Sequence, residues 1–224
     1  YSVTASDANG CTAVDQVTVT VGSAVANAGP DQTICLGTST TLSATGGTSY
    51  QWSTGATTQS ITVNPSSTTT YTVTVSDVNG CTDVDQMTVT VGSASVEAGP
   101  NQTICLGSST TLNATGTGTF YQWSTGQTGA TISVNPSTTT TYSVTASDAN
   151  GCTAVDQVTV TVGSASVDAG PDQTICLGTS TTLNATGTGA TYQWSTGATT
   201  QSITVNPTTT TTYSVTASDV NGCT

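Results

Sequence analysis

The stretch Tyr1–Val21, YSVTASDANGCTAVDQVTVTV, decides the fold. Closely similar stretches begin again at Tyr71, Tyr142 and Tyr213. In each copy, apolar residues that alternate with Ser or Thr flank a turn of the form Asp-x-Asn-Gly-Cys, which predicts a β-hairpin with a glycine-containing loop. The chain is therefore predicted to be a tandem array with a period of about 70 residues. The turn cysteines lie 70, 71 and 71 residues apart: Cys11, Cys81, Cys152 and Cys223.

Alignment on the turns divides the chain into four parts. Residues 1–21 are predicted to be the last hairpin of a preceding repeat. Residues 22–91 and 92–162 form two whole repeats, called the first and second repeats. Residues 163–224, the third repeat, are predicted to stop before their last strand. Because a Gly-Ser pair is the only linker, neighbouring repeats are expected to touch and to form an elongated, semi-rigid rod.

Each repeat has the pattern of about seven short strands with turn signals every 8 to 12 residues. This pattern predicts an all-β fold, with one immunoglobulin-like β-sandwich per repeat. In the first repeat, the opening strand is interrupted by Gly29 and Pro30. Proline has no backbone donor, so this point is expected at a sheet edge or at a switch between sheets.

Each repeat carries one tryptophan on its third strand and one tyrosine at the start of its hairpin. The tryptophan is predicted to anchor the core, and an exposed ring that stacks on sugars is the alternative. The tyrosine has the position of a tyrosine corner, whose hydroxyl bonds to the preceding backbone. The predicted core residues are Trp52, Trp123, Trp194, Tyr71, Tyr142 and Tyr213.

The charge of the chain excludes several classes of function. There is no Lys, Arg or His, and the formal net charge is −12. A chain without cations cannot displace the counterions of nucleic acid, and an anionic membrane surface is disfavoured for the same reason. No apolar run is long enough for a membrane span, so direct insertion is not expected. Because the usual His and Lys bases are missing, the chain is predicted not to be an enzyme.

The seven cysteines are predicted to form disulfides outside the cytoplasm, because no Cys-x-x-Cys pair or His completes a zinc site. In an end-to-end rod, Cys35 is expected near the end of its repeat that faces the next repeat, called the bottom. Cys81 is expected near the opposite end, called the top. About seven strand residues separate the two ends, roughly 25 Å, whereas a disulfide needs Cα atoms within about 7 Å.

The bottom of one repeat faces the top of the next, so the predicted bridges join successive repeats. They pair Cys35 with Cys152 and Cys105 with Cys223. Cys11, Cys81 and Cys176 are left to partners outside these 224 residues. A side-by-side arrangement of repeats would instead restore local pairs such as Cys35 with Cys81.

Calcium is the one candidate cofactor, at Asp77, Asn79, Asp83 and Asp85 in the first repeat. Asp and Asn are favoured in such turns without any metal, because they cap the turn, and a single carboxylate is a poor calcium site. The other copies have Ala in place of Asp83.

Three asparagines, Asn101, Asn113 and Asn184, lie in Asn-x-Thr sequons. They are candidate glycan acceptors where the exporting cell has that pathway.

Residues 50–63, YQWSTGATTQSITV, and residues 70–83, TYTVTVSDVNGCTD, closely resemble the SprB-type repeat of Bacteroidota cell-surface proteins, which is named for a gliding-motility adhesin. The preceding AGPDQTIC (28–35) and TLSATG (41–46) are similar to the first strands of PKD-like domains. Together the two parts cover the whole chain. The resemblance implies an extracellular, repeat-built adhesin or surface filament exported by the type IX system. PKD domains often carry Trp-Asp-Phe-Gly-Asp-Gly where this chain has WSTGAT (52–57), so properties tied to those aspartates are not carried over.

The expected function is the non-catalytic, structural shaft of an extracellular adhesin or surface filament. Two alternatives stay open: a carbohydrate-binding array on a secreted polysaccharide-degrading protein, and a cell-surface sheath packed through its Thr faces. The expected partners are further repeats of the same polypeptide, surface polysaccharide or other copies of the fibre. Exposure of the three tryptophan rings would favour sugar binding, and burial would favour a shaft.

Overall fold

The computed structural model describes residues 1–224 and contains strands and turns but no helix. The chain forms two compact units, Tyr1–Ser93 and Ala94–Thr224. The first unit holds the N-terminal hairpin and the first repeat, and the second unit holds the second and third repeats.

The N-terminal hairpin pairs β1 (Ser2–Ser6) with β2 (Thr12–Gln16) in antiparallel register. The prediction that the second strand continues to Val21 is wrong, because residues 17–21 are not in a strand. The last backbone bonds of the hairpin join Tyr1 and Val17: the Val17 amide donates to the Tyr1 carbonyl at 2.9 Å, and the Tyr1 ammonium donates to the Val17 carbonyl at 2.8 Å. The matching residues of the two whole repeats are held in a strand by pairing with Gln32–Cys35 and Gln102–Cys105.

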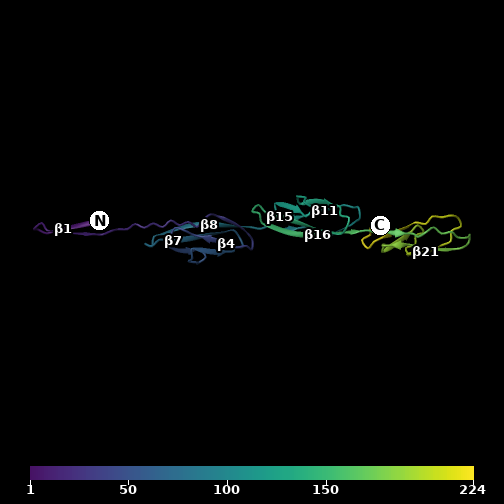
Figure 1. Ribbon diagram of the computed structural model, residues 1–224, viewed down its shortest axis with the longest axis horizontal. Coiled ribbons are helices and arrows are strands. Elements are labelled where there is room, and N and C mark those ends of the chain that lie inside the picture. The colour runs from purple at the N-terminus through teal and green to yellow at the C-terminus, as the bar shows by residue number, and fades with distance from the viewer. The chain divides into compact units, whose positions relative to one another are not determined.

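The first repeat is a sandwich of a four-stranded sheet, in the order β3-β8-β7-β5, and a two-stranded sheet, β4-β6. Strands β7 and β8 form the long hairpin predicted from the Asp-x-Asn-Gly-Cys turn, and β3 runs parallel to β8. Figure 1 labels β4, β7 and β8. The bounds are β3 (Gln32–Cys35), β4 (Thr40–Ser43), β5 (Ser49–Trp52), β6 (Ser60–Val63), β7 (Thr69–Ser76) and β8 (Thr82–Gly92).

The chain changes sheets at Gly29 and Pro30, as the sequence predicts. Before this point, Asn27 forms an antiparallel bridge with Thr45, next to β4. After it, β3 joins the other sheet. Gly29 has φ +86°, a left-handed conformation that glycine adopts without strain. The opening segment therefore contributes to both sheets.

The second repeat has the same architecture, with the sheet β10-β16-β15-β13 opposite β11-β14 and a small β9-β12 ladder. Figure 1 labels β11, β15 and β16. Seven strands per repeat are predicted; six form in the first repeat and eight in the second, where β9 and β12 have two residues each. The bounds are β9 (Val96–Glu97), β10 (Gln102–Cys105), β11 (Thr110–Asn113), β12 (Thr115–Gly116), β13 (Phe120–Trp123), β14 (Thr131–Val134), β15 (Thr140–Ser147) and β16 (Thr153–Gly163).

The third repeat forms three of the strand pairs that the second repeat contains, each as a two-stranded sheet: β17-β19, β18-β21 and β20-β22. Residues 173–176, which match β3 and β10, form no strand. The reason is that β3 and β10 pair with the last strand of their own repeats, and residues 163–224 supply no such strand. The bounds are β17 (Val167–Asp168), β18 (Thr181–Asn184), β19 (Thr186–Gly187), β20 (Thr191–Trp194), β21 (Ser202–Val205) and β22 (Val215–Ser218).

Each repeat has its own hydrophobic core between its sheets. Alternation along the strands turns valine inward and threonine outward, as in β15, where Val144 is fully buried and its neighbours are partly exposed. The fold is thus an array of immunoglobulin-like β-sandwiches with separate cores.

Candidate functional site

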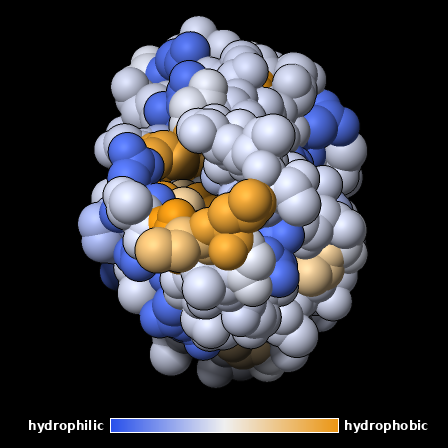
Figure 2. Space-filling model, turned by 90° about the vertical axis from the view of Figure 1, so that its right-hand side faces the viewer, coloured by the Kyte–Doolittle hydropathy of each residue, from blue (hydrophilic) through white to orange (hydrophobic).

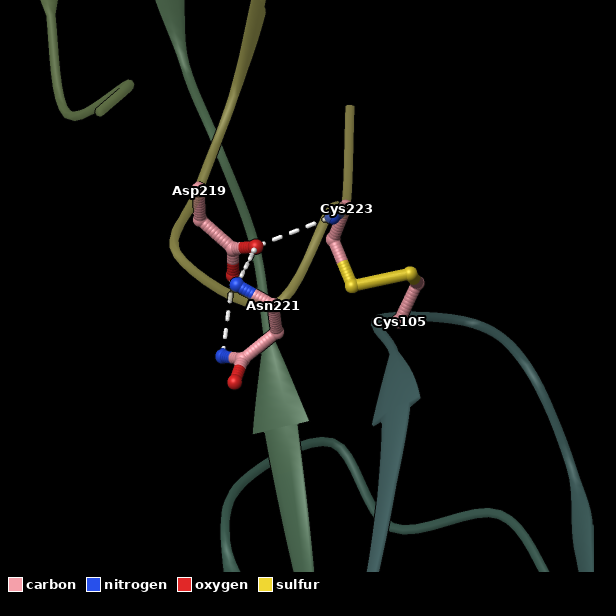
Figure 3. The surroundings of a disulfide bond; sticks show 4 residues. All are labelled: Cys105, Asp219, Asn221 and Cys223. Carbon is pink, nitrogen blue, oxygen red and sulfur yellow. Dashed lines mark hydrogen bonds between the residues drawn. A yellow bond between two sulfur atoms is a disulfide. The ribbon is translucent and has the colours of Figure 1, made fainter. Parts of the chain in front are cut away.

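The Asp-x-Asn-Gly-Cys turn is a local structure that fixes the position of its cysteine. In the third repeat, Asp219 Oδ1 accepts hydrogen bonds from the amides of Asn221, at 2.8 Å, and Cys223, at 2.9 Å (Figure 3). Gly222, with φ +83°, lets the chain reverse. Asp7 and Asp77 make the same pair of bonds in the earlier copies.

Within the second unit, this turn is bonded covalently to the second repeat. Cys105 ends β10, and Cys223 of the third repeat forms a disulfide with it, with Cα atoms 5.3 Å apart. That separation lies within the range that a disulfide requires. Figure 3 shows the bond beside the Asp219 turn. The bond joins the first strand of one repeat to the hairpin turn of the next.

The linker glycine is packed tightly against the same turn. Gly163 lies opposite Cys105 in the β10-β16 ladder. A Cβ on Gly163 would lie 2.4 Å from Asp219 Oδ2 and 2.9 Å from Cys223 Sγ. Real Cβ atoms do not occur at such distances, so a larger residue at Gly163 would force the side chains of the turn to shift.

The first unit shows the same arrangement around Gly22. A Cβ there would lie 2.5 Å from Asp77 Oδ2 and 3.0 Å from Cys81 Sγ. The close approach of linker and turn is therefore a repeated feature of the array.

The remaining cysteines divide into two groups. Cys35 and Cys152 are disulfide-bonded. Cys11, Cys81 and Cys176 are free thiols, of which Cys11 and Cys176 are exposed.

Two aspartates tie the last strand of each whole repeat to its opening segment. Asp85 Oδ2 accepts a hydrogen bond from the Ala28 amide at 2.8 Å, and Asp156 Oδ2 accepts one from the Ala98 amide at 2.7 Å. These backbone hydrogen bonds lower the pKa of both carboxyl groups below 3.8. The turn aspartates Asp77 and Asp219 also have a lowered pKa, caused first by the amides of Cys81 and Cys223.

The candidate calcium ligands have other roles in the structure. Asp83 Oδ2 accepts a hydrogen bond from the Ala26 amide at 2.8 Å, Asp85 holds Ala28, and Asp77 caps its own turn with Asn79. No group of three or more Asp, Glu, His or Cys side chains is placed to hold a metal ion. Backbone amides are the hydrogen-bond partners of these carboxylates.

The lowered pKa values predict a loss of stability in acid. A carboxyl group with a depressed folded-state pKa stabilises the fold above its unfolded value of 3.8, and this contribution disappears as the pH falls through the folded-state pKa. We expect the melting temperature of the chain to be level near neutral pH and to fall below pH 3.8.

Thermal melts from pH 7 to pH 2 would measure this effect. Asp85→Asn with Asp156→Asn should flatten the acid fall, because an amide keeps the acceptor oxygen and does not titrate. Glu97→Gln, which changes an exposed carboxylate of the second repeat, is the control. Equal acid slopes in the double variant and the control would contradict the prediction.

The three tryptophan rings are buried in the cores. Trp52, Trp123 and Trp194 are 1%, 2% and 1% exposed. Each indole N–H donates to a backbone carbonyl, that of Thr58, Gly129 and Thr200 respectively, at 3.0 to 3.1 Å. A sugar-stacking platform needs an exposed ring face, and these rings present none.

The tyrosines at the start of the hairpins lie in or against the cores. Tyr71 and Tyr142 are buried, and Tyr213 packs on the core of the third repeat. A different tyrosine of each whole repeat donates a hydrogen bond to the backbone just before its own strand. Tyr50 donates to the Gly47 carbonyl at 3.0 Å and Tyr121 to the Gly116 carbonyl at 3.3 Å. These tyrosines lie on β5 and β13, two residues before the core tryptophan. Their hydroxyls therefore hold the loop that leads into each of these strands.

The sequon asparagines are all on the surface. Asn101 Oδ1 accepts a hydrogen bond from the Thr159 amide at 2.8 Å, and Asn113 Oδ1 accepts one from Thr131 Oγ1 at 2.8 Å. Asn184 Oδ1 accepts one from the Ser202 hydroxyl.

Sequence reasoning missed the roles of Gly163 and of Asp156. A signal for the aspartate was present, since Val-Asp-Gln occurs after each of the first three turns. Spacing alone did not show that this aspartate faces the opening segment, because Asp156 and Ala98 are 58 residues apart.

No helix in the chain is long and apolar enough to cross a membrane. No protein-family model matches the sequence, and no curated protein matches it.

Among solved structures, a three-domain immunoglobulin fragment of titin matches with a TM-score of 0.40 and 15% identity, over 74% of this chain and 76% of that one. The insect immune protein hemolin matches with a TM-score of 0.40 and 15% identity, over 71% and 55%. Two immunoglobulin domains of DIP-gamma match with a TM-score of 0.36 and 12% identity, over 63% and 95%. Likenesses at this level do not support any particular function.

Proposed function

We propose that the chain is a non-catalytic, structural section of an extracellular adhesin shaft or surface filament. The observation that carries the proposal is the joint in the second unit. There, the Cys105–Cys223 disulfide, the Asp219 turn and the close packing at Gly163 connect one sandwich to the next. A binding module needs an accessible recognition surface, whereas these three features connect one repeat to the next.

The joint is suited to carrying tension because the disulfide provides a covalent path that bypasses residues 106–222, which are most of the second repeat and most of the third. Cys105 and Cys223 are separated by 118 residues in the sequence. A pulling force between a residue before Cys105 and residue 224 passes through the disulfide, so the residues between the two cysteines are shielded from extension. By repeat equivalence, we propose that Cys35 and Cys152 form the matching bridge one repeat earlier.

The proposal also includes the location of the chain, the kind of adhesin, its partners and its glycan acceptors. Disulfides persist in oxidising compartments, which supports a location outside the cytoplasm, at the cell surface. The resemblance to SprB-type repeats supports a gliding-motility or related Bacteroidota adhesin exported by the type IX system. Its partners would be further repeats of the same polypeptide, together with surface polysaccharide or other copies of the fibre. The exposed sequons at Asn101, Asn113 and Asn184 are proposed glycan acceptors in cells with that pathway.

Single-molecule force spectroscopy tests the shaft proposal. Handles attached at Ser93 and Thr224 would stretch the second unit. The oxidised chain should extend little beyond its folded length. The Cys105→Ser, Cys223→Ser variant should release an additional length of roughly 40 nm, because 118 residues at about 3.6 Å each become extensible.

Reduction of the unsubstituted chain should give the same gain, and reduction of the double variant should add nothing. If the oxidised chain and the double variant extend to the same length, the disulfide does not carry the force and the shaft proposal fails.

A further inference from the structure

The second repeat has a strand whose outer edge is unpaired. Strand β14 pairs with β11 and with no other strand. The Ala114 amide donates to the Ala130 carbonyl at 2.8 Å, and along an antiparallel ladder residues alternate between bonding to the partner strand and pointing away from it. By this alternation, the backbone N–H and C=O groups of Thr131 and Ser133 point away from β11. Both residues are exposed, so these groups are open to solvent.

In the first and third repeats, a threonine hydroxyl caps the matching edge. Thr58 Oγ1 donates to the Ser60 carbonyl at 2.7 Å. Thr200 Oγ1 donates to the Ser202 carbonyl, also at 2.7 Å. The counterpart in the second repeat is the Thr131 carbonyl, and the residue two positions before it is glycine, which has no hydroxyl to donate. The second repeat therefore leaves open a carbonyl that the other two repeats cap.

The edge of β14 also lacks the features that usually prevent sheet edges from pairing with other chains, namely charged side chains, proline and bulges. The strand has the sequence Thr-Ile-Ser-Val, and its register with β11 is regular over all four residues. Residues 98–147 contain no charged side chain. Most of the molecular face in Figure 2 is likewise pale, the colour of residues of intermediate hydropathy. Nothing along β14 therefore opposes the approach of another strand.

A second copy of β14 fits this edge by symmetry. Antiparallel pairing about a two-fold axis between the two Ile132 residues places Thr131 of each copy opposite Ser133 of the other. Each of these two residue pairs exchanges both of its backbone hydrogen bonds. All the open N–H and C=O groups of one strand are then satisfied by the same groups of its copy.

The side chains of the open edge fit the same pairing. Within the chain, hydroxyls lie opposite one another across a ladder, as Thr70 and Thr88 do, with Oγ1 atoms 3.1 Å apart. Thr131 and Ser133 would form two such hydroxyl pairs across the interface, and cross-strand pairs of this kind stabilise sheets. Two chains with a net charge of −12 can meet along the uncharged residues 98–147 without bringing carboxylates together.

We propose that two copies of the chain pair antiparallel through β14, so that β11 and β14 of both copies form one continuous four-stranded sheet. The inference rests on the proposed function and names the surface through which other copies of the fibre bind. Antiparallel strands make the paired chains run in opposite directions. This is the arrangement of filaments that extend from two facing cells, so the pairing would serve contact between cells.

Cysteine cross-linking tests the register on the 224-residue chain. Cys11→Ser, Cys81→Ser and Cys176→Ser first remove the free thiols. Thr131→Cys is then made in one batch of this chain and Ser133→Cys in another. Directly opposite residues have Cα atoms about 5.5 Å apart, within the range of a disulfide, whereas diagonal neighbours are about 7–8 Å apart. With oxidised glutathione, the mixed batches should form a covalent dimer roughly tenfold faster than either batch alone.

Sedimentation equilibrium of the chain with its native Thr131 and Ser133 tests the open edge itself. The pairing is small, so the dimer should be weak and its fraction should rise with concentration. Ser133→Pro removes an N–H that faces away from β11, and it should abolish the dimer. Thr62→Pro is the control, because it makes the same change at the matching position of β6 and should leave the dimer unchanged.

Exchange of one loop tests the threonine cap without a proline. Residues 127–130, QTGA, are replaced by ATTQ, the sequence of residues 56–59, which brings threonine to position 129. A capped Thr131 carbonyl in both copies removes two of the four backbone bonds of the interface, so the dissociation constant should rise roughly tenfold. Thr58→Gly with Thr200→Gly opens the matching edges of the first and third repeats and should strengthen association.

Three results would overturn the proposal: a monomer at every concentration, an unchanged dissociation constant after the loop exchange, or batches that cross-link with themselves as fast as with each other. Tryptophan fluorescence would confirm that the loop-exchange chain is folded. None of these results depends on the force measurement within a single chain, so the proposed shaft and the proposed pairing can fail separately.

Discussion

Trp123→Ala is expected to destabilise the second repeat by about 3–5 kcal/mol, the usual cost of deleting a large buried aromatic side chain. Trp123 is 2% exposed and packs in a core made mostly of small valines and alanines. Few neighbours can move in to fill the cavity. The substitution also leaves the Gly129 carbonyl without the indole N–H that it accepts at 3.1 Å.

Hydrogen–deuterium exchange is the appropriate measurement, because separate cores need not unfold in one step. Exchange of β13 to β16 should accelerate by a factor of roughly 100 or more, since each 1.4 kcal/mol is about tenfold. Phe120→Ala is the control, because it removes an aromatic ring from the same strand that is 50% exposed. Similar exchange in the two variants would show that Trp123 is not the anchor of the core.

Gly163→Val is expected to break the joint between the second and third repeats. The added side chain would meet Asp219 Oδ2 at 2.4 Å and Cys223 Sγ at 2.9 Å, so these two side chains, or the turn that carries them, must shift away from β16. Movement of Cys223 separates it from Cys105, and loss of a native disulfide costs about 2–5 kcal/mol. Thiol titration of the unfolded protein should find the three free cysteines of the native chain and, in addition, Cys105 and Cys223.

Ser164→Val provides the control for this prediction. Ser164 follows Gly163 in the linker, and its side chain is exposed, so the joint should accept valine there. A Gly163→Val chain that still contains the Cys105–Cys223 bond would show that the linker glycine is not required for space.

Much of the fold could be predicted because it depends on residues that are close in the sequence. The hairpin of β7 and β8 follows from strict alternation on each side of the Asp77 turn, and the change of sheets follows from Gly29 and Pro30. Burial of Trp52 follows from its place on a strand in a unit with little other bulk. These are properties of local backbone torsions and side-chain period.

Predictions that required a specific partner over a long distance were less complete. The sequence did not indicate that the Tyr50 hydroxyl donates to the Gly47 carbonyl. It extended the N-terminal strand to Val21, whereas residues 17–21 are not in a strand. It did not indicate that Asp83 and Asp85 accept hydrogen bonds from the amides of Ala26 and Ala28.

The sequence by itself determined the period of the array, the hairpin turns and the inward faces of the strands, because each depends on a few consecutive residues and on the two-residue alternation of a strand. Only the tertiary structure determined which residues come into contact at the joint between the second and third repeats. Parallel pairing of β10 with β16 brings Cys105 beside Gly163, and the fold of the next repeat brings Cys223 to the same point from 118 residues away. Contacts of this kind depend on how whole sheets pack, and no local pattern encodes the distance between them.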